Sequence, residues 1–161
     1  MRSIVVYHSL SGTTRKVAEL AAKDLGADLI EVHAPRYGRG VVSYVRAAFD
    51  SIRGKLPDIS ISGSAPDPFD FVLLAAPVWA GHASTPMRAY LMQHKGKFKH
   101  AAFVLTCGGH APPKAFDEMS ADAGVKPEKT FTLREKDVKA GAALPADLAA
   151  FLASIRLKLA A

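Results

Sequence analysis

The stretch SIVVYHSLSGTTRKVAELAAKDLGADLIEV, residues 3–32, carries the pattern that decides the fold. Residues 3–7 form a nearly continuous apolar run, which is typical of a strand buried on both faces. Residues 14–25 repeat apolar side chains at helical spacing, and Gly26 ends that helix. Residues 28–32 then alternate as a second strand does. This succession predicts a βαβ unit with a parallel sheet.

The rest of the chain continues the alternation of strands and helices. Further strands are predicted at residues 69–76, 100–106 and 130–133, with a short extended piece at 59–61. Further helices are predicted at residues 41–52, 85–94, 113–123 and 144–159. Pro77 is expected to end the strand before it, and Thr85 to cap the helix that Pro86 opens. Residues 1–161 therefore predict one domain, a three-layer α/β sandwich.

Length and composition agree with one globular domain. The chain has 161 residues, of which 49% are hydrophobic and 22% charged. No apolar run approaches the ~20 residues of a membrane span, and no secretory signal pattern opens the chain, so we expect a soluble, cytoplasmic protein. Cys107 is the lone cysteine, which excludes an internal disulfide, and the histidines lack metal-ligand spacing. We therefore expect no metal site.

The formal net charge of +6 has two interpretations. One is an ordinary basic surface, and the other is attraction to an anionic partner such as a nucleotide or an acidic protein. The basic residues gather at residues 36–55 and 95–99 rather than in a tail. No nucleic-acid-binding motif accompanies them, and aromatic residues do not interleave with them, so we expect no nucleic-acid partner.

The loop after the first predicted strand is rich in hydroxyl groups and leads directly into a helix. It consists of Ser9, Leu10, Ser11, Gly12, Thr13 and Thr14. Free N–H groups and the helix dipole make such a place an anion site, and Gly12 lets the backbone approach closely. The loop has neither GxxxxGK[ST] nor GxGxxG, which favours a single terminal phosphate. The alternative is a polar loop that only caps the helix.

Residues 5–18 resemble the N-terminal signature of the flavodoxin family. Five positions fall in register, namely Tyr7, Ser9, Gly12, Thr14 and Ala18. Ala21 departs from the signature, which has a larger aliphatic residue there, and this affects packing rather than the loop. The resemblance covers essentially the whole chain, because later loops match in order. It implies flavin mononucleotide (FMN) as cofactor, with its phosphate in the first loop, and a five-stranded parallel sheet of order 2-1-3-4-5.

The resemblance also assigns a role to the loop after the central strand. This second loop consists of Pro77, Val78, Trp79, Ala80, Gly81 and His82. In flavodoxin-like proteins it lies against the isoalloxazine, which implies that Trp79 stacks on the ring. The alternative is a tryptophan that fills a surface groove. His82 has two alternatives as well, to donate to the N1/O2 edge of the flavin or to cap the next helix.

A third loop follows the strand at 100–106. It consists of Thr106, Cys107, Gly108 and Gly109, in which the glycines permit close approach of a ligand. The resemblance implies that its backbone amides contact the pyrimidine edge of the flavin. Cys107 is either a redox thiol or a small buried hydrophobic residue, and the second interpretation is favoured.

Flavin binding alone does not fix the reaction. We expect an oxidoreductase that passes electrons from NAD(P)H to a quinone or another small acceptor. The alternatives are an electron-transfer flavodoxin and a structural or regulatory module that binds FMN weakly. The basic charge argues against a low-potential carrier of the acidic type, although a carrier for an acidic redox protein stays open.

No catalytic residue is assigned, because the flavin itself is the reactive group. Side chains that are candidates for shaping the substrate side are Tyr37, Arg39, His82 and His110. In the helix at 41–52, one apolar stripe is formed by Val42, Val45, Ala48, Phe49 and Ile52. Related two-electron enzymes are often dimers, and by analogy this helix is a candidate homodimer interface.

Overall fold

A seven-stranded, mostly parallel sheet forms the centre of the protein. The computed structural model describes residues 1–63, 69–139 and 143–161. The strands are β1 (Ser3–Tyr7), β2 (Asp28–His33), β3 (Ser60–Ser62), β4 (Phe71–Trp79), β5 (His82–Ala83), β6 (His100–Cys107) and β7 (Lys129–Arg134). The helices are α1 (Thr13–Leu25), α2 (Val41–Arg53), α3 (Thr85–Gln93), α4 (Pro113–Ala123), α5 (Glu135–Lys139) and α6 (Ala146–Ala160).

Five strands of the sheet are parallel and stand in the order β2-β1-β4-β6-β7. These are the five predicted strands in their predicted order. The prediction of a five-stranded, wholly parallel sheet is nevertheless wrong, because β3 pairs antiparallel with β2 and β5 pairs antiparallel with the end of β4. β3 is the extended piece expected at 59–61, and it extends the sheet at its β2 edge.

The central strand continues through Pro77 instead of ending there. The Pro77 carbonyl accepts a hydrogen bond from the N–H of Ser84 at 2.9 Å, so the strand extends to Trp79. Ala80 and Gly81 then both take positive φ, 49° and 81°, and form the two-residue turn of a β-hairpin. The predicted second loop is therefore a hairpin. Its return strand leads into α3, whose N-cap is Ser84 and not Thr85.

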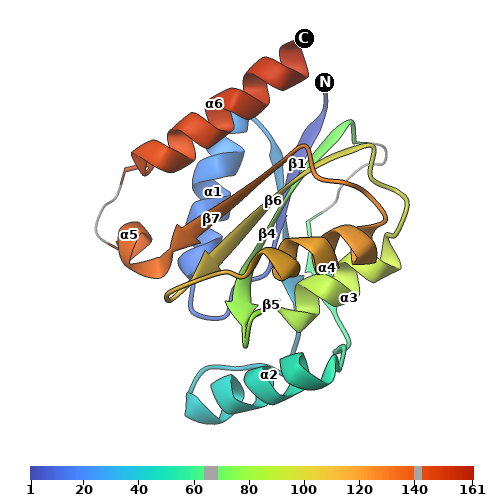
Figure 1. Ribbon diagram of the computed structural model, residues 1–161, viewed down its shortest axis with the longest axis vertical. Helices are drawn as coiled ribbons and strands as arrows, with labels where there is room; N and C mark the ends of the chain where they lie inside the picture. Colours follow the sequence, from blue (N-terminus) through green and yellow to red (C-terminus); the bar gives the residue numbers. More distant parts are fainter. Residues whose placement is uncertain (64–68, 140–142) are drawn as a thin grey trace.

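Helices cover both faces of the sheet, as expected for three layers. α1 and α6 pack on one face, and α3 and α4 on the other (Figure 1). The strands supply both cores because their side chains alternate: Val5 and Tyr7 contact the α1 side, while Ile4 and Val6 contact the α3 side. The short helix α5, which was not predicted, adds the buried Val138 to the α1 side.

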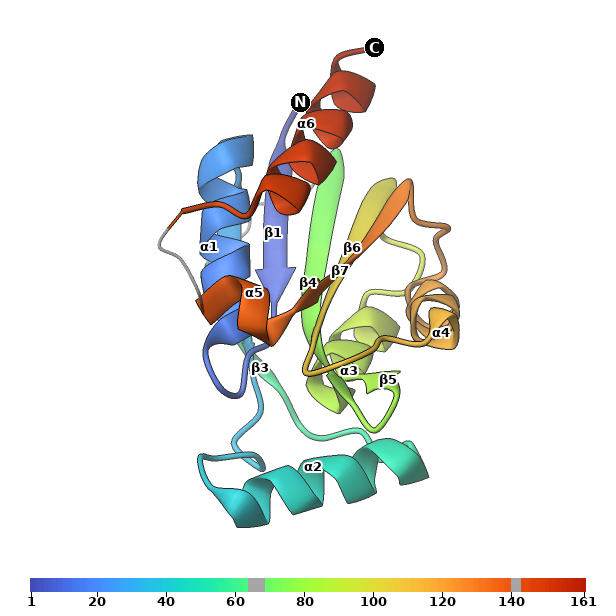
Figure 2. The ribbon, with the colours of Figure 1, turned by 60° about the vertical axis from the view of Figure 1, so that its left-hand side comes forward.

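α2 belongs to neither layer. It lies across the end of the molecule at which the parallel strands finish, while the two termini lie at the opposite end (Figure 2). α2 contacts the body through a small cluster of its own, in which Ala47 packs with Ala34, Tyr37 and Trp79. The carboxyl edge of the sheet, where ligands bind in open α/β folds, is therefore bordered by α2.

Candidate functional site

The first predicted loop connects β1 to α1 at the carboxyl edge of the sheet. Gly12 is the N-cap of α1 with φ 95°, a conformation that strongly favours glycine. Its N–H donates to the Ser9 hydroxyl at 3.0 Å, and the hydroxyls of Ser11 and Thr13 lie 3.4 Å apart. The N–H groups of the first turn of a helix have no acceptor within the helix. In α1 no side chain caps them either. The loop therefore presents the N–H and hydroxyl groups that an anion site requires.

Thr14 and Thr106 bind each other across the site. Their hydroxyl oxygens are 2.7 Å apart, and both residues are buried. Both were predicted to contact the cofactor. That contact stays a prediction, and in the structure their hydrogen bond ties the first turn of α1 to the end of β6.

The arginine just beyond the loop points away from it. The Arg15 guanidinium donates to the Glu31 carboxylate of β2 at 2.5 Å, and this partner raises the pKa of Arg15. Glu31 also contributes to holding the pKa of the buried Tyr7 hydroxyl at about 12, where desolvation is the larger cause. An anion at the loop would therefore meet amides and hydroxyls rather than Arg15.

A cleft of about 190 Å³ opens beside the first loop. Leu10 and Ser11 line it from that loop, and residues 77–80 line it from β4 and the hairpin turn. The first two predicted segments therefore border a single space.

The opposite walls of this cleft were not predicted. Tyr44, Ala47 and Ala48 line it from α2, and Glu135 lines it from α5. The sequence predicted α2 as a helix, but nothing in it indicated that the helix crosses this edge. α5 is too short to have a periodic pattern.

The Trp79 side chain is almost fully buried against its neighbours, and little of it faces solvent. Only 7% of its surface is exposed, and its ring meets those of His8 and Tyr37 edge-on, at centroid distances of 5.2 and 5.0 Å. Its carbonyl accepts a hydrogen bond from the Ser51 hydroxyl of α2 at 2.7 Å. Trp79 still lines the cleft, so stacking on a flavin stays a prediction, with only a small part of the ring available.

His8, the first residue after β1, is a buried and neutral histidine. Its Nδ1 lies 3.0 Å from the Ser84 hydroxyl, and burial lowers its pKa to about 3. The His8 ring meets the Trp79 ring edge-on. Nothing in the sequence assigned His8 to the site, because a lone histidine after a strand carries no functional pattern.

His82 does not cap the next helix, because the N-cap of α3 is Ser84 and no side chain caps that helix. Its Nδ1 lies 2.8 Å from a carboxylate oxygen of Glu118 on α4, so it joins the hairpin to that helix. A role at the flavin edge stays a prediction.

The third loop has a buried and an open half. Thr106 and Cys107 are buried, and burial raises the pKa of the Cys107 thiol, which favours the small-hydrophobe interpretation over a redox thiol. Gly108 and Gly109 are exposed, and a Cβ added to either meets no atom within 4 Å. Neither glycine is required by packing, and together they leave open space at the end of β6.

The remaining substrate-side candidates differ in exposure. Tyr37 is buried, and its hydroxyl donates to Asp50 at 2.7 Å and lies 3.0 Å from that of Thr85, so it has a structural role. Arg39 and His110 are exposed in loops at the carboxyl edge. Only these two are free to face a substrate.

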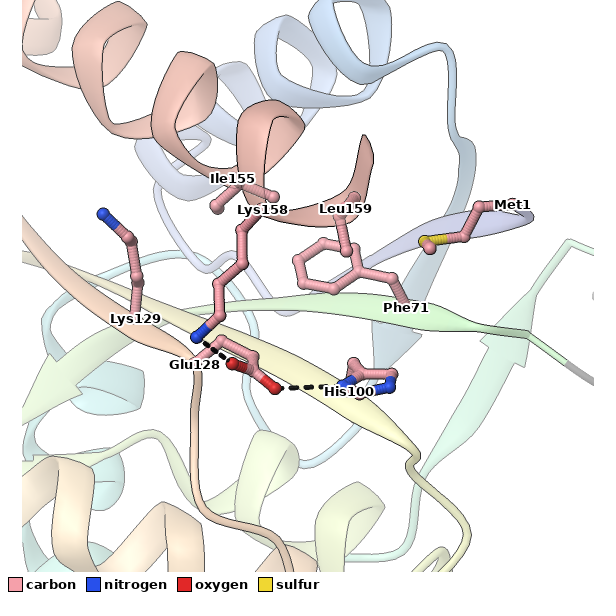
Figure 3. A pocket seen from close by; sticks show the side chains of 8 residues that line it. All are labelled: Met1, Phe71, His100, Glu128, Lys129, Ile155, Lys158 and Leu159. Carbon is pink, nitrogen blue, oxygen red and sulfur yellow. Dashed lines mark hydrogen bonds and ion pairs between the residues drawn. The ribbon is translucent and has the colours of Figure 1, made fainter. Parts of the chain in front are cut away.

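A second cavity, of about 120 Å³, lies at the opposite edge of the sheet (Figure 3). Its Glu128 carboxylate binds both the Lys158 ammonium and His100, whose Nδ1 is 2.9 Å away. Phe71 and Ile155 supply apolar walls. Because the Glu128 carboxylate is already paired, it is not available to a cationic ligand, although Lys129 also lines this cavity.

Within residues 1–63, 69–139 and 143–161, no group of three or more His, Cys, Asp or Glu side chains is placed to hold a metal ion. Across the same residues, no helix has the length and apolar character needed to cross a membrane.

Comparisons with known proteins identify the fold. No protein-family model and no curated protein matches the chain. Among solved structures, an FMN complex of a flavoprotein from Lactobacillus acidophilus NCFM is 24% identical, with a TM-score of 0.71 over 81% of this chain and 92% of that one. Oxidised flavodoxin 2 from Bacillus cereus is 15% identical, with a TM-score of 0.56 over 98% and 99%. An apo NADH:FMN oxidoreductase is 19% identical, with a TM-score of 0.54 over 94% and 84%. This chain therefore has the flavodoxin-like fold.

Proposed function

We propose that this chain binds FMN at the carboxyl edge of its sheet and acts as an oxidoreductase that passes electrons from NAD(P)H to a quinone or another small acceptor. One observation carries the binding proposal. The uncapped start of α1 and the 190 Å³ cleft share Leu10 and Ser11, so an anion site and an apolar cleft adjoin. FMN combines those two chemistries in one molecule, a terminal phosphate and a flat apolar ring.

The residues at the start of α1 and in the cleft suit the phosphate and the ring of FMN. The amides of the first turn of α1, with the hydroxyls of Ser9, Ser11 and Thr13, would hold the phosphate. Leu10 and Trp79 would border the ring. The cleft is smaller than the roughly 300 Å³ of a small ligand pocket, so part of the ring would stay in solvent and accessible to a donor or acceptor.

Charge supports an anionic electron donor. Bound FMN supplies one- or two-electron redox chemistry. The chain carries a net charge of +6, and the exposed Arg39 lies in the loop that leads to α2. This positive charge would attract the phosphates of a nicotinamide nucleotide, whereas the Glu135 carboxylate in the cleft wall would disfavour an anionic flavin.

A pair of glycine variants tests the phosphate loop. Gly12 and Gly26 are at the two ends of α1, both with positive φ and with open space around a new Cβ. Gly12→Ala and Gly26→Ala should therefore cost similar stability, about 1 kcal/mol each. We expect only Gly12→Ala to weaken FMN, by about tenfold or more, while riboflavin, which lacks the phosphate, changes little.

Flavin absorbance and the quenching of Trp79 fluorescence measure this binding. Equal losses for FMN and riboflavin, or equal losses in the two variants, would show that the phosphate lies elsewhere. An unchanged flavin spectrum and unquenched Trp79 at micromolar FMN would remove the binding proposal altogether.

Stopped-flow reduction separates the enzyme from the carrier. We expect NADH or NADPH to bleach the flavin absorbance of the FMN-loaded protein, and a quinone to restore it. A flavin that stays oxidised with both nucleotides, but is reduced reversibly by dithionite, would refute the reductase and leave an electron carrier.

A further inference from the structure

α2 presents its apolar side to solvent. Val42, Val45, Phe49 and Ile52, here called the α2 seam, are each between 53% and 72% exposed. A surface helix normally turns such a stripe toward the core. A contiguous apolar stripe that faces water instead marks a surface for interaction.

The polar side of the same helix is turned inward and fixed there. Asp50 is buried and accepts a two-pronged ion pair from Arg36, with Nε at 2.5 Å, and a hydrogen bond from Tyr37 at 2.7 Å. The buried Ser51 hydroxyl donates to the Trp79 carbonyl at 2.7 Å. Rolling α2 to bury its seam would break these bonds and leave buried polar groups unpaired, so the seam is held outward.

The spacing of the seam specifies a helical partner. Its members recur at intervals of three, four and three residues, which is the a/d pattern of two helices packed side by side. Val41 and Tyr44, also more than half exposed, widen the surface. Six side chains of this size offer on the order of 600 Å² of apolar area, close to the ~800 Å² per partner of a stable protein interface.

We propose that a second copy of this chain covers this surface, so that the α2 helices of two protomers pack against each other across a two-fold axis. A two-fold interface needs only one self-complementary patch, and the chain itself supplies a helix with the required pattern. The proposal is independent of flavin binding. It also places the partner protomer next to the cleft, because Tyr44 belongs to both the apolar surface and the cleft wall.

The charges beside the seam distinguish this occupant from others. Arg46 and Arg53 lie on the same flank of α2, seven residues apart. The Arg53 guanidinium is 5.7 Å from the Phe49 ring centroid. Within the described residues, neither arginine has an ion-pair partner. Two copies bring like charges together, so salt should strengthen the dimer by screening them. Binding to an acidic protein or an anionic membrane would weaken with salt instead.

Sedimentation equilibrium of the full chain tests the proposal. We expect the wild type to have twice the monomer mass at about 100 µM, with a dissociation constant that falls as salt rises. Phe49→Glu and Ile52→Glu should each raise that constant at least tenfold, about 1.4 kcal/mol. The matched control is Leu157→Glu, at a residue 75% exposed on α6, which should leave the dimer unchanged.

Circular dichroism and thermal unfolding should show all three variants folded, because each replaced side chain is exposed. A wild type that stays monomeric, or a dimer that tolerates both α2 substitutions, would overturn the proposal. A monomer that floats with phosphatidylserine-rich vesicles at low salt and detaches at high salt would assign the seam to a membrane surface instead.

Discussion

The hydrogen bond between the hydroxyls of Thr14 and Thr106 should stabilise the candidate site. Replacing either threonine by valine leaves the other hydroxyl buried without its partner, which should cost about 1–2 kcal/mol of unfolding free energy. The double variant removes both polar groups, so its loss should be clearly less than the sum of the two single losses. Urea unfolding measures the cycle. Additive losses would show that the two hydroxyls do not depend on each other.

His8 should make the stability of the protein depend on pH. Its pKa is about 3 when folded, against an ordinary value of 6.5, so below about pH 6.5 the unfolded chain binds a proton that the folded one does not. The unfolding free energy should therefore fall as the pH falls, by about 2 kcal/mol between pH 7 and pH 5. His8→Asn should flatten this slope in urea unfolding. The control is His110→Asn, an exposed histidine, which should keep it.

The candidate site was predictable to the level of segments but not of side-chain directions. The first loop was identified from its residue types and the loop at 77–82 from the family resemblance, and the structure brings Leu10, Ser11 and residues 77–80 to one cleft. The sequence does not show that Thr14 turns toward Thr106, or that Trp79 is enclosed by His8 and Tyr37. Those directions follow from contacts between segments far apart in the chain, which no local pattern encodes.

At the scale of elements, Asp50 anchors α2 to the body. The Arg36 guanidinium, and then Tyr37, lower the pKa of Asp50, so the carboxylate stabilises the fold at neutral pH and loses this effect as pH falls through its depressed folded pKa. Asp50→Ala removes the carboxylate partner of Arg36 and leaves the Tyr37 hydroxyl with Thr85 alone, which should cost about 2–3 kcal/mol.

Asp58→Ala is the matched control for that substitution, because Asp58 is exposed; its effect should stay within about 0.5 kcal/mol. Urea unfolding at neutral pH measures both variants. Hydrogen exchange should additionally show faster exchange of the α2 amides in Asp50→Ala. Equal stability of the two variants would mean that α2 is held by its apolar contacts alone.

The periodicity of the sequence predicted which segments are helices and strands, but it did not predict which side of each helix is buried. The three strands and four helices predicted beyond the first βαβ unit are all present, but Pro77 did not end β4, because its carbonyl still accepts a hydrogen bond within the hairpin. α2 has the predicted stripe, yet the stripe faces outward. Periodicity reveals that a helix has two sides, whereas the side that is buried depends on whether buried polar residues, here Asp50 and Ser51, find partners.

At the scale of the whole molecule, the sheet separates two apolar cores that should unfold together. Leu91 lies in the core on the α3 side and Leu152 in the core on the α6 side, and both are fully buried. Leu91→Ala and Leu152→Ala should each cost about 3 kcal/mol, since each leaves a cavity beside the same strands. Denaturant curves followed by Trp79 fluorescence and by circular dichroism should coincide in both variants. Separate transitions would indicate two independent units.

Because Thr14 and Thr106 are far apart in the sequence, the loop before α1 is synthesised well before the strand that it contacts. The two residues are 92 positions apart, so the loop before α1 leaves the ribosome long before Thr106 has been synthesised. Parallel strands pair only after their helical crossovers close, which makes the arrival of β6 beside β4 a late event. Binding of the proposed cofactor at this edge would therefore belong to the last stage of folding.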